Sequence, residues 1–195
     1  MLPDVASSKR GLKRGLWTRT RTVILMLDET IITETPPLYG CYGRVGTQVR
    51  VPITGSRAKR ILHGVLNIGT GAVLLLITDV WNEQTHQHFL TLIRSHWRGW
   101  RIVVFEDRGT PHTTEDTREL AKDLHVDLRF LPTATPKLNA MDHLWRNVKG
   151  RAVANRPTKT IDLSAYEACQ HLLKMSPRQR LQTAGVLSSN FWLTR

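Results

Sequence analysis

The 195-residue sequence has few of the features that mark secreted or membrane proteins. Its two cysteines, Cys41 and Cys169, lie far apart and in no CxxC motif. A disulfide framework and a cysteine zinc site are therefore excluded, and a reducing compartment is expected. No stretch reaches the roughly 18 apolar residues that a membrane-spanning helix needs. Residues 1–17 are basic but contain no apolar segment, so they do not resemble a secretory signal, and we expect a cytoplasmic protein.

Acidic residues are also scarce. The sequence has 16 Asp and Glu against 28 Lys and Arg, which leaves a formal net charge of +12. This excess predicts a polyanionic partner, nucleic acid rather than a membrane surface, although a role in solubility alone is the alternative. Charge by itself predicts weak and salt-sensitive DNA binding, with a Kd on the order of 10⁻⁴–10⁻⁶ M. Residues 1–21 concentrate this charge and are expected to form a basic arm, which includes Lys13 and Arg14.

From residue 22 onward, short apolar runs alternate with amphipathic segments. The runs predict buried strands at 22–27, 101–106 and 126–132 and a hairpin formed by 60–67 and 72–78. Helices are predicted at 82–97, 113–125, 140–154, 162–175 and 177–185. The segment 34–59, rich in proline and glycine, should be mostly loop with a short strand at 47–53. Strands joined by helical crossovers predict an α/β fold, a mixed sheet with helices on both faces.

Two of the predicted buried strands are followed directly by aspartate. Asp28 follows "VILML" and Asp107 follows "IVVFE". If the strands are parallel neighbours, both side chains emerge side by side at the carboxyl ends of the strands, where open α/β sheets place their ligands. Two carboxylates that close repel each other, and a divalent cation relieves the repulsion. Glu29 and Glu106 are the alternative ligands, and strand alternation sends each to the opposite side from its neighbour.

A third acid, Asp142, lies on the predicted helix 140–154. It is about 100° around the helix axis from Met141 on the buried stripe, at the edge of the face that packs on the sheet. Arg146 and Lys149 follow it and supply a cationic flank. Three acids beside basic residues fit a phosphodiester substrate. Two metal ions roughly 3.5–4 Å apart would hold the attacking and leaving oxygens of the reaction. The alternative is a surface Asp142 paired with Arg146.

Other polar residues are candidates with weaker patterns. His112 could contact DNA, orient a ligand or cap the helix that follows it. His86 and His88, two positions apart on a predicted helix, point apart and are not expected to form a zinc site together. Candidate phosphate contacts, besides those of the basic arm, are Arg57, Lys59, Arg60, Arg146 and Lys149.

Three segments, "LDET", "EDRGTPH" and "LPTATPKLNAMDHLWRNVKG", resemble the three motifs of DDE/D transposases of the mariner superfamily, in its bacterial insertion-sequence branch. Between Asp107 and Asp142 lie 34 residues, 108–141, a spacing typical of that superfamily. The resemblance covers about residues 22–155. The third motif matches at Leu131, Pro132, Pro136, Leu138, Asn139, Asp142 and Trp145.

The resemblance implies an RNase H-like fold and a metal-dependent DNA strand transferase. Asp28, Asp107 and Asp142 would be the catalytic, metal-binding triad, holding Mg²⁺ or Mn²⁺ as two ions. Such enzymes cut DNA at the ends of a mobile element and join the freed 3′-OH to target DNA, usually at TA. The resemblance also implies at least a dimer on DNA and a bacterial, nucleoid-associated protein.

The sequence departs from that pattern in two respects. Most bacterial relatives have Glu where Asp142 stands, so its helix must approach the other acids more closely or a water must bridge. A helix-turn-helix domain normally precedes the first strand, and here only the arm 1–21 does. We therefore expect a catalytic domain at 22–155, a helical extension at 156–195 packed on it, and a DNA-reading partner supplied separately or by a split reading frame. The alternative functions are another RNase H-like nuclease and a catalytically silent DNA-binding remnant.

Overall fold

A mixed β-sheet forms the centre of the computed structural model, which describes residues 21–53 and 55–194. The predicted arm, with Lys13 and Arg14, lies outside the described residues except for Arg21. Within them the sheet has five strands in the order β3-β2-β1-β4-β5. The neighbours β1, β4 and β5 run parallel to one another, whereas β2 is antiparallel to both of its neighbours, β1 and β3. The strands are β1 (Thr22–Thr33), β2 (Lys59–Asn67), β3 (Val73–Thr78), β4 (Arg101–Glu106) and β5 (Val126–Phe130).

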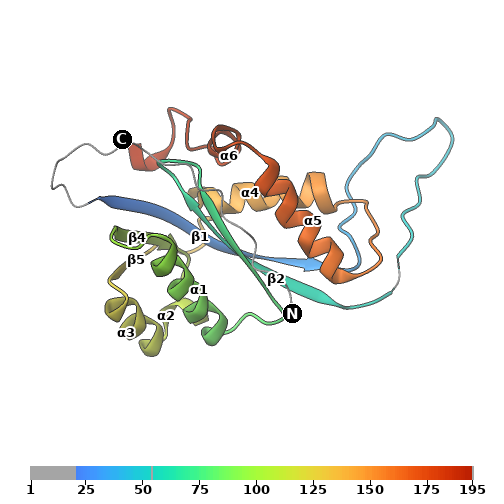
Figure 1. Ribbon diagram of the computed structural model, residues 1–195. Coiled ribbons are helices and arrows are strands. Elements are labelled where there is room, and N and C mark those ends of the chain that lie inside the picture. Colours follow the sequence, from blue (N-terminus) through green and yellow to red (C-terminus); the bar gives the residue numbers. More distant parts are fainter. Residues whose placement is uncertain (1–20, 54, 195) are drawn as a thin grey trace.

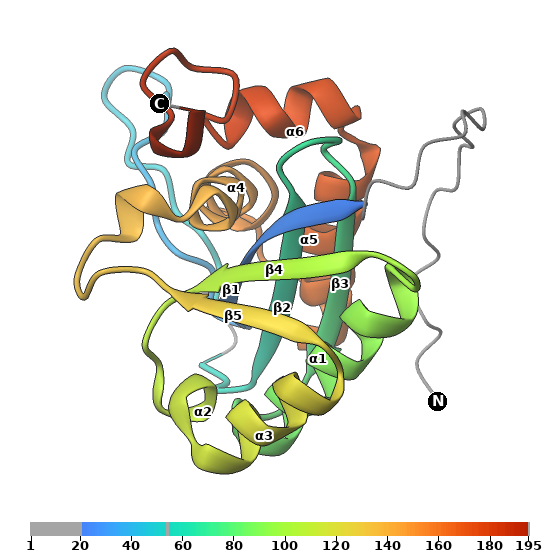
Figure 2. The ribbon, with the colours of Figure 1, turned by 90° about the vertical axis from the view of Figure 1, so that its left-hand side faces the viewer.

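Helices cover both faces of this sheet, as the sequence predicts (Figures 1 and 2). One face carries α1 (Glu83–His96), α2 (Thr110–Thr113) and α3 (Glu115–Asp123). The other face carries α4 (Ala140–Val148), α5 (Ile161–Lys174) and α6 (Pro177–Thr183). Each face buries its own apolar cluster, one around Phe89 and the other around Trp145. None of the helices within the described residues is long and apolar enough to cross a membrane.

Two helix starts are fixed by asparagine, and one of them positions the functional site. Asn82 forms a capping box with Thr85 at the start of α1. Asn139 caps α4 by accepting the Met141 N–H at 3.0 Å, and its Nδ2 donates to the Leu27 carbonyl at 2.8 Å. The same side chain therefore begins α4 and ties it to the middle of β1.

The first strand is longer than predicted. It continues beyond residue 27 to Thr33, because residues 28–33 pair antiparallel with β2 from Gly64 back to Lys59. Pairing with β4 ends earlier, at Met26 and Phe105. The prediction that Asp28 follows a strand end is thus wrong for β1 as a whole. It holds only for the pairing of β1 with β4, which ends at Met26, two positions before Asp28.

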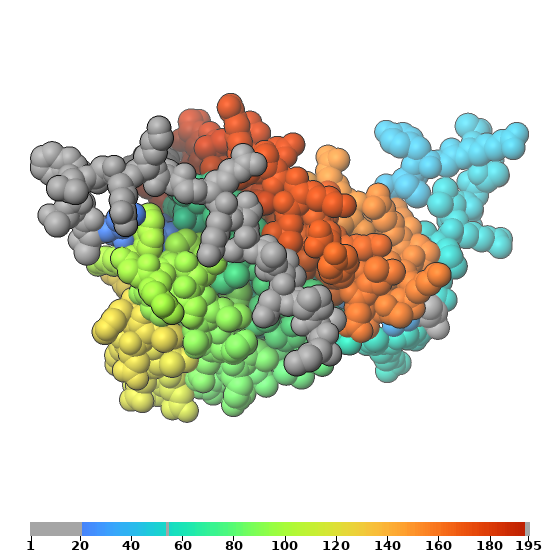
Figure 3. Space-filling model, viewed as in Figure 1, coloured from blue at the N-terminus to red at the C-terminus, as the bar shows by residue number. Residues whose placement is uncertain are grey.

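Three smaller predictions also need correction. No strand forms at 47–53, since this segment belongs to a loop that projects from the body of the molecule, away from the sheet (Figure 3, light blue). The predicted helix 113–125 is shorter, α3 at Glu115–Asp123, because Thr114 caps its start by accepting the Thr117 N–H, and the short helix α2, Thr110–Thr113, which was not predicted, precedes it. The helix beginning at residue 140 turns into a π-helix at Lys149–Val153.

The segment after residue 155 shares the apolar cluster of α4. Ala165, Ala168, Cys169 and Leu172 of α5 are completely buried in it. Arg180 of α6 is also buried, and its guanidinium donates to the carbonyls of Leu172, Leu173 and Gly71, the last in the β2–β3 turn. Two short 3₁₀ helices, Pro136–Leu138 and Trp192–Thr194, complete the described structure, and Trp192 Nε1 donates to the Leu138 carbonyl.

Candidate active site

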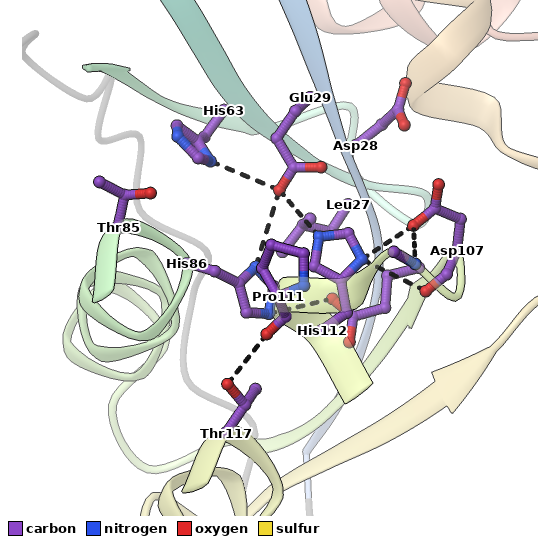
Figure 4. Close-up of polar contacts among 12 residues, drawn as sticks. Leu27, Asp28, Glu29, His63, Thr85, His86, Asp107, Pro111, His112 and Thr117 are labelled. Atoms are coloured by element: carbon purple, nitrogen blue, oxygen red, sulfur yellow. Dashed lines mark hydrogen bonds and ion pairs between the residues drawn. The ribbon is translucent and has the colours of Figure 1, made fainter. Parts of the chain in front are cut away.

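Strand alternation separates Asp28 from its neighbour Glu29. The side chain of Asp28 lies on the α4 side of the sheet, while Glu29 points to the α1 side (Figure 4). The same alternation places Glu106 on the α1 side, where it faces His86, and leaves Asp107 at the strand end beside Asp28. The two aspartates that were predicted to lie together therefore share one side, and the two glutamates share the other.

Asp28, Asp107 and Asp142 line one pocket of about 310 Å³. The three come from separate segments: β1, the residue after β4, and the first turn of α4. The opposite wall is the loop between β5 and α4. The other residues of the lining are Arg108, Gly109, Leu131, Pro132, Thr133, Ala134, Thr135, Pro136 and Asn139.

Asp28 is the carboxyl group in this pocket that is hardest to ionise. Burial raises its pKa to about 8, and the charges of Glu29, Asp142 and Asp107 add to the effect. A carboxyl in this position keeps a proton at neutral pH unless a cation takes the proton's place. The pocket therefore combines oxygen donors with an electrostatic need for positive charge.

Asp107 is held in the ionised form by two donors. His112 Nδ1 lies 2.8 Å from Asp107 Oδ1, and the Gly109 N–H donates to the same oxygen at 2.8 Å. The hydrogen bond from His112 is the main reason that the pKa of Asp107 lies below its ordinary value. The Asp107 side chain nevertheless remains 62% exposed, so it can still bind a ligand in the pocket.

Asp142 forms an ion pair with Arg146, which was one of the two readings of the sequence, with Arg146 Nη2 at 2.5 Å from Asp142 Oδ2. It still lines the pocket.

The helix that carries Asp142, α4, packs tightly on β2 at Gly64, which pairs with Asp28. A Cβ at Gly64 would lie 2.5 Å from the Trp145 ring and even closer to the Met141 methyl group. Trp145 Nε1 also donates to the Asp28 carbonyl. These contacts hold α4, and Asp142 with it, close against β1 and β2.

A second polar cluster on the α1 side was not predicted. One oxygen of Glu29, Oε1, lies 3.4 Å from His63 Nδ1, 3.6 Å from His86 Nδ1 and 3.2 Å from His112 Nε2 (Figure 4). His86 Nε2 in turn lies 3.4 Å from Glu106 Oε2. Glu106 and the histidines are almost completely buried. Strand register brings part of this cluster together, because Glu29 of β1 pairs with His63 of β2.

The ionisation states in this cluster differ sharply. Burial opposes the ionisation of Glu29, but its hydrogen bond with His112 and the nearby imidazoles of His63 and His86 outweigh burial and hold its pKa well below the usual range. Burial raises the pKa of Glu106 to about 8 and lowers that of His86. Burial also opposes the charge on His112, yet Asp107 and Glu29 raise its pKa to about 11.

His112 connects the two clusters, since Nδ1 faces Asp107 and Nε2 faces Glu29. Its side chain is 1% exposed and offers no surface to DNA, so the contact with DNA considered from the sequence does not fit its position. Of the roles left open, the geometry favours orienting a ligand residue, Asp107. His86 and His88 do point apart, as predicted: His86 is buried and His88 is exposed.

The candidate phosphate contacts lie in different surroundings. Arg57, Lys59 and Arg146 are exposed, and Lys149 is partly buried. Arg60 is already paired, with its Nε 3.0 Å from Asp79 and 2.8 Å from Asp162. An additional exposed cation, Arg108, lines the acidic pocket and was not singled out from the sequence.

The sequence model of the family described as "DDE superfamily endonuclease" matches residues 23–163. Among curated proteins, the Transposable element Tcb2 transposase of Caenorhabditis briggsae is 36% identical over 64 residues. That match covers 30% of this chain and 23% of the relative.

The fold is shared with solved structures of the Mos1 mariner transposase. The catalytic domain of Mos1 superposes with a TM-score of 0.61 at 14% identity, covering 86% of this chain and 78% of that one. The Mos1 Strand Transfer Complex gives a TM-score of 0.66 at 16% identity, covering 86% of this chain and 51% of the Mos1 chain. The chain therefore spans about half the length of the Mos1 protein in that complex, and the shared architecture is the RNase H-like fold.

Proposed function

This chain belongs to the DDE superfamily endonuclease family, and from that premise we propose that it is the catalytic part of a DNA transposase. The observation that carries the proposal is the meeting of Asp28, Asp107 and Asp142 in one pocket, from three separate segments. The relatives support it, because Tcb2 is named a transposase and Mos1 is solved in a strand transfer complex. The proposed reaction cuts DNA at element ends and joins the 3′-OH end to a target, with TA as the proposed target sequence.

The donor set of the pocket fits Mg²⁺ or Mn²⁺. Its three carboxylates are hard oxygen ligands, and the raised pKa of Asp28 marks a place where positive charge is favoured. Solved Mos1 complexes include one with Mg and one with Mn. When bound, a pair of such ions would supply Lewis-acid stabilisation of the charge that develops on the phosphodiester oxygens.

Residues of the chain itself would prepare and position the substrate. Asp28, Asp107 and Asp142 would hold the cations, and His112 would keep Asp107 ionised and correctly oriented. Arg108 lines the pocket and Arg146 borders it through its pair with Asp142, so both can receive phosphate groups of the DNA backbone. The exposed Arg57 and Lys59 and the partly buried Lys149 would extend this contact, as would Lys13 and Arg14 of the predicted arm.

The same proposal includes partners and organisation. The net charge of +12 supports DNA as the partner. We propose at least a dimer on DNA, a helix-turn-helix module supplied by another segment or chain, and an origin in the bacterial insertion-sequence branch with a cytoplasmic, nucleoid-associated location. The basic arm at 1–21, a catalytic domain at 22–155 and a packed extension at 156–195 remain the proposed division of the chain.

A strand-transfer assay tests the function. The substrate is a duplex with a pre-cut 3′-OH end, taken from the inverted repeats that flank the gene, and the target is a plasmid, with Mn²⁺ or Mg²⁺ present. We expect joined products that disappear in Asp28→Asn, Asp107→Asn and Asp142→Asn. Cleavage without joining would identify another RNase H-like nuclease. Neither reaction, in a protein that still binds DNA, would identify a silent remnant.

A further inference from the structure

The buried cluster on the α1 side of the sheet contains a set of atoms arranged as metal ligands are. The ligand atoms of Glu29, His86 and His112 all lie within 4.8 Å of one another. Glu29 Oε1 is 3.6 Å from His86 Nδ1 and 3.2 Å from His112 Nε2. Ligands at the usual 2.0–2.1 Å from a tetrahedral Zn²⁺ are about 3.3 Å apart, so these separations match two edges of such a site.

The second nitrogen of each histidine faces a carboxylate. His86 Nε2 lies 3.4 Å from Glu106 Oε2, and His112 Nδ1 lies 2.8 Å from Asp107 Oδ1. Histidines that bind metals nearly always donate their other ring N–H to a carboxylate or carbonyl, which fixes the tautomer and the ring orientation. His112 therefore has the outer partner that a metal ligand requires, and Glu106 lies in the corresponding place beside His86 without a hydrogen bond to it.

Several polar atoms in this cluster lack the hydrogen bonds that burial normally demands. Within the described part of the chain, both ring nitrogens of His86 and both carboxyl oxygens of Glu106 have no hydrogen-bond partner. His63 Nδ1 is in the same position, 3.4 Å from Glu29 Oε1. A cation between Glu29, His86 and His112 would give His86 Nδ1 a partner, and it would displace to solvent the proton that His112 Nε2 shares with Glu29.

We propose that Glu29, His86 and His112 form a binding site for a transition-metal ion such as Zn²⁺, distinct from the acidic pocket. Imidazole nitrogens favour zinc and its neighbours in the periodic table, whereas Mg²⁺ prefers the all-oxygen pocket on the other side. The site goes beyond the proposed transposase function and has a structural role. By holding His112, the ion fixes the hydrogen bond that positions Asp107.

Cobalt substitution of the whole chain tests the site without any activity measurement. Tetrahedral Co²⁺ absorbs strongly in the visible range, while octahedral Co²⁺ in an oxygen pocket absorbs weakly. We expect stoichiometric Co²⁺ binding with the strong spectrum, displaced by Zn²⁺. Proton NMR of the same sample should show shifted, exchangeable imidazole N–H signals, one each from His86 and His112. Only the weak spectrum, with no shifted imidazole signal, would overturn the proposal.

Paired variants locate the ion. His86→Gln should abolish the strong spectrum, and His88→Gln, on the exposed side of the same helix, should leave it unchanged. The double variant Asp28→Asn with Asp142→Asn should also retain it, because these residues belong to the acidic pocket. Loss of the spectrum in that double variant and its retention in His86→Gln would place the ion in the pocket and refute the site. If circular dichroism shows His86→Gln unfolded, the NMR signals of the unaltered protein decide.

Discussion

The two sides of the sheet carry two clusters that use adjacent residues of the same strands in different ways. On the α4 side, Asp28 and Asp107 face an open pocket with oxygen donors. On the α1 side, Glu29 and Glu106 are enclosed with histidines. In each cluster one carboxyl is kept ionised with help from His112, and the pKa of another is raised to about 8 by burial. The surroundings, not the residue type, decide which chemistry a carboxyl can perform.

The largest effect should separate two neighbours at the end of β4. Asp107→Asn should abolish cleavage, because it removes a carboxylate from the pocket, while DNA binding at low salt stays intact or becomes stronger through the loss of a negative charge. Glu106→Gln, one position earlier and on the other side, should retain cleavage. Both are measured with a labelled DNA duplex. Cleavage by Asp107→Asn would remove Asp107 from the proposed site.

Two variants of His112 test the link between the clusters. His112→Gln can replace the contact of Nε2 with Glu29 but not that of Nδ1 with Asp107, and we expect activity to fall about 10–100-fold. The acid limb of the pH–rate profile of His112→Gln should move to higher pH, because the pKa of Asp107 is no longer lowered by His112. His112→Asn, which can keep the contact with Asp107, should lose less activity. Equal losses in the two variants would contradict a positioning role.

Gly64→Ala tests the packing that brings Asp142 to the pocket. The added methyl group would collide with Met141 and Trp145, so the free energy of unfolding should fall by about 1–3 kcal/mol. Affinity for Mn²⁺ should fall as well, since α4 must move away from β1. Urea denaturation and Mn²⁺ titration measure the two effects. Gly69→Ala, whose nearest neighbour would be 3.4 Å away, is the control and should change neither.

The smallest effect concerns how the free energy of unfolding depends on pH, measured with a chelator present. Glu106 has a pKa of about 8 in the folded protein and 4.5 in the reference state. Between these values the folded protein keeps a proton that the unfolded chain has released, so stability falls as pH rises. Glu106→Gln should remove this slope. At pH 8 the free energy of unfolding of this variant should exceed that of the unaltered protein by at least about 1.4 kcal/mol, the equivalent of one pKa unit. Urea denaturation at pH 5 and pH 8 measures the change in stability. If the free energy of unfolding changes equally between these pH values in both proteins, the assignment to Glu106 is contradicted.

The architecture and the acidic pocket could be predicted because their determinants are local. Apolar runs locate β4 and β5, and the helix after Asn82 begins where its capping side chain predicts. Asp28 and Asp107 meet because parallel neighbours end at one edge, even though β1 itself continues past Asp28.

The histidine cluster could not be predicted because its members meet only through tertiary register. Glu29 faces His63 only once β1 extends along β2, a pairing that no local apolar run marks. His86 rather than His88 points inward because α1 packs Phe89 and Ile93 on the sheet, which sets the rotation of the helix. The pairing of Asp142 with Arg146 was left open for a similar reason, since side chains four positions apart on a helix can meet without having to.

The buried guanidinium of Arg180 reaches across from α6 to the β2–β3 turn and to the last carbonyls of α5. If the chain were shortened at residue 155, the turn would lose this donor and the apolar surface beneath α5 would be exposed to solvent. Folding of the segment after residue 155 and of the sheet is therefore expected to be one cooperative event, so a shortened protein would aggregate or be degraded before its acidic pocket could be tested.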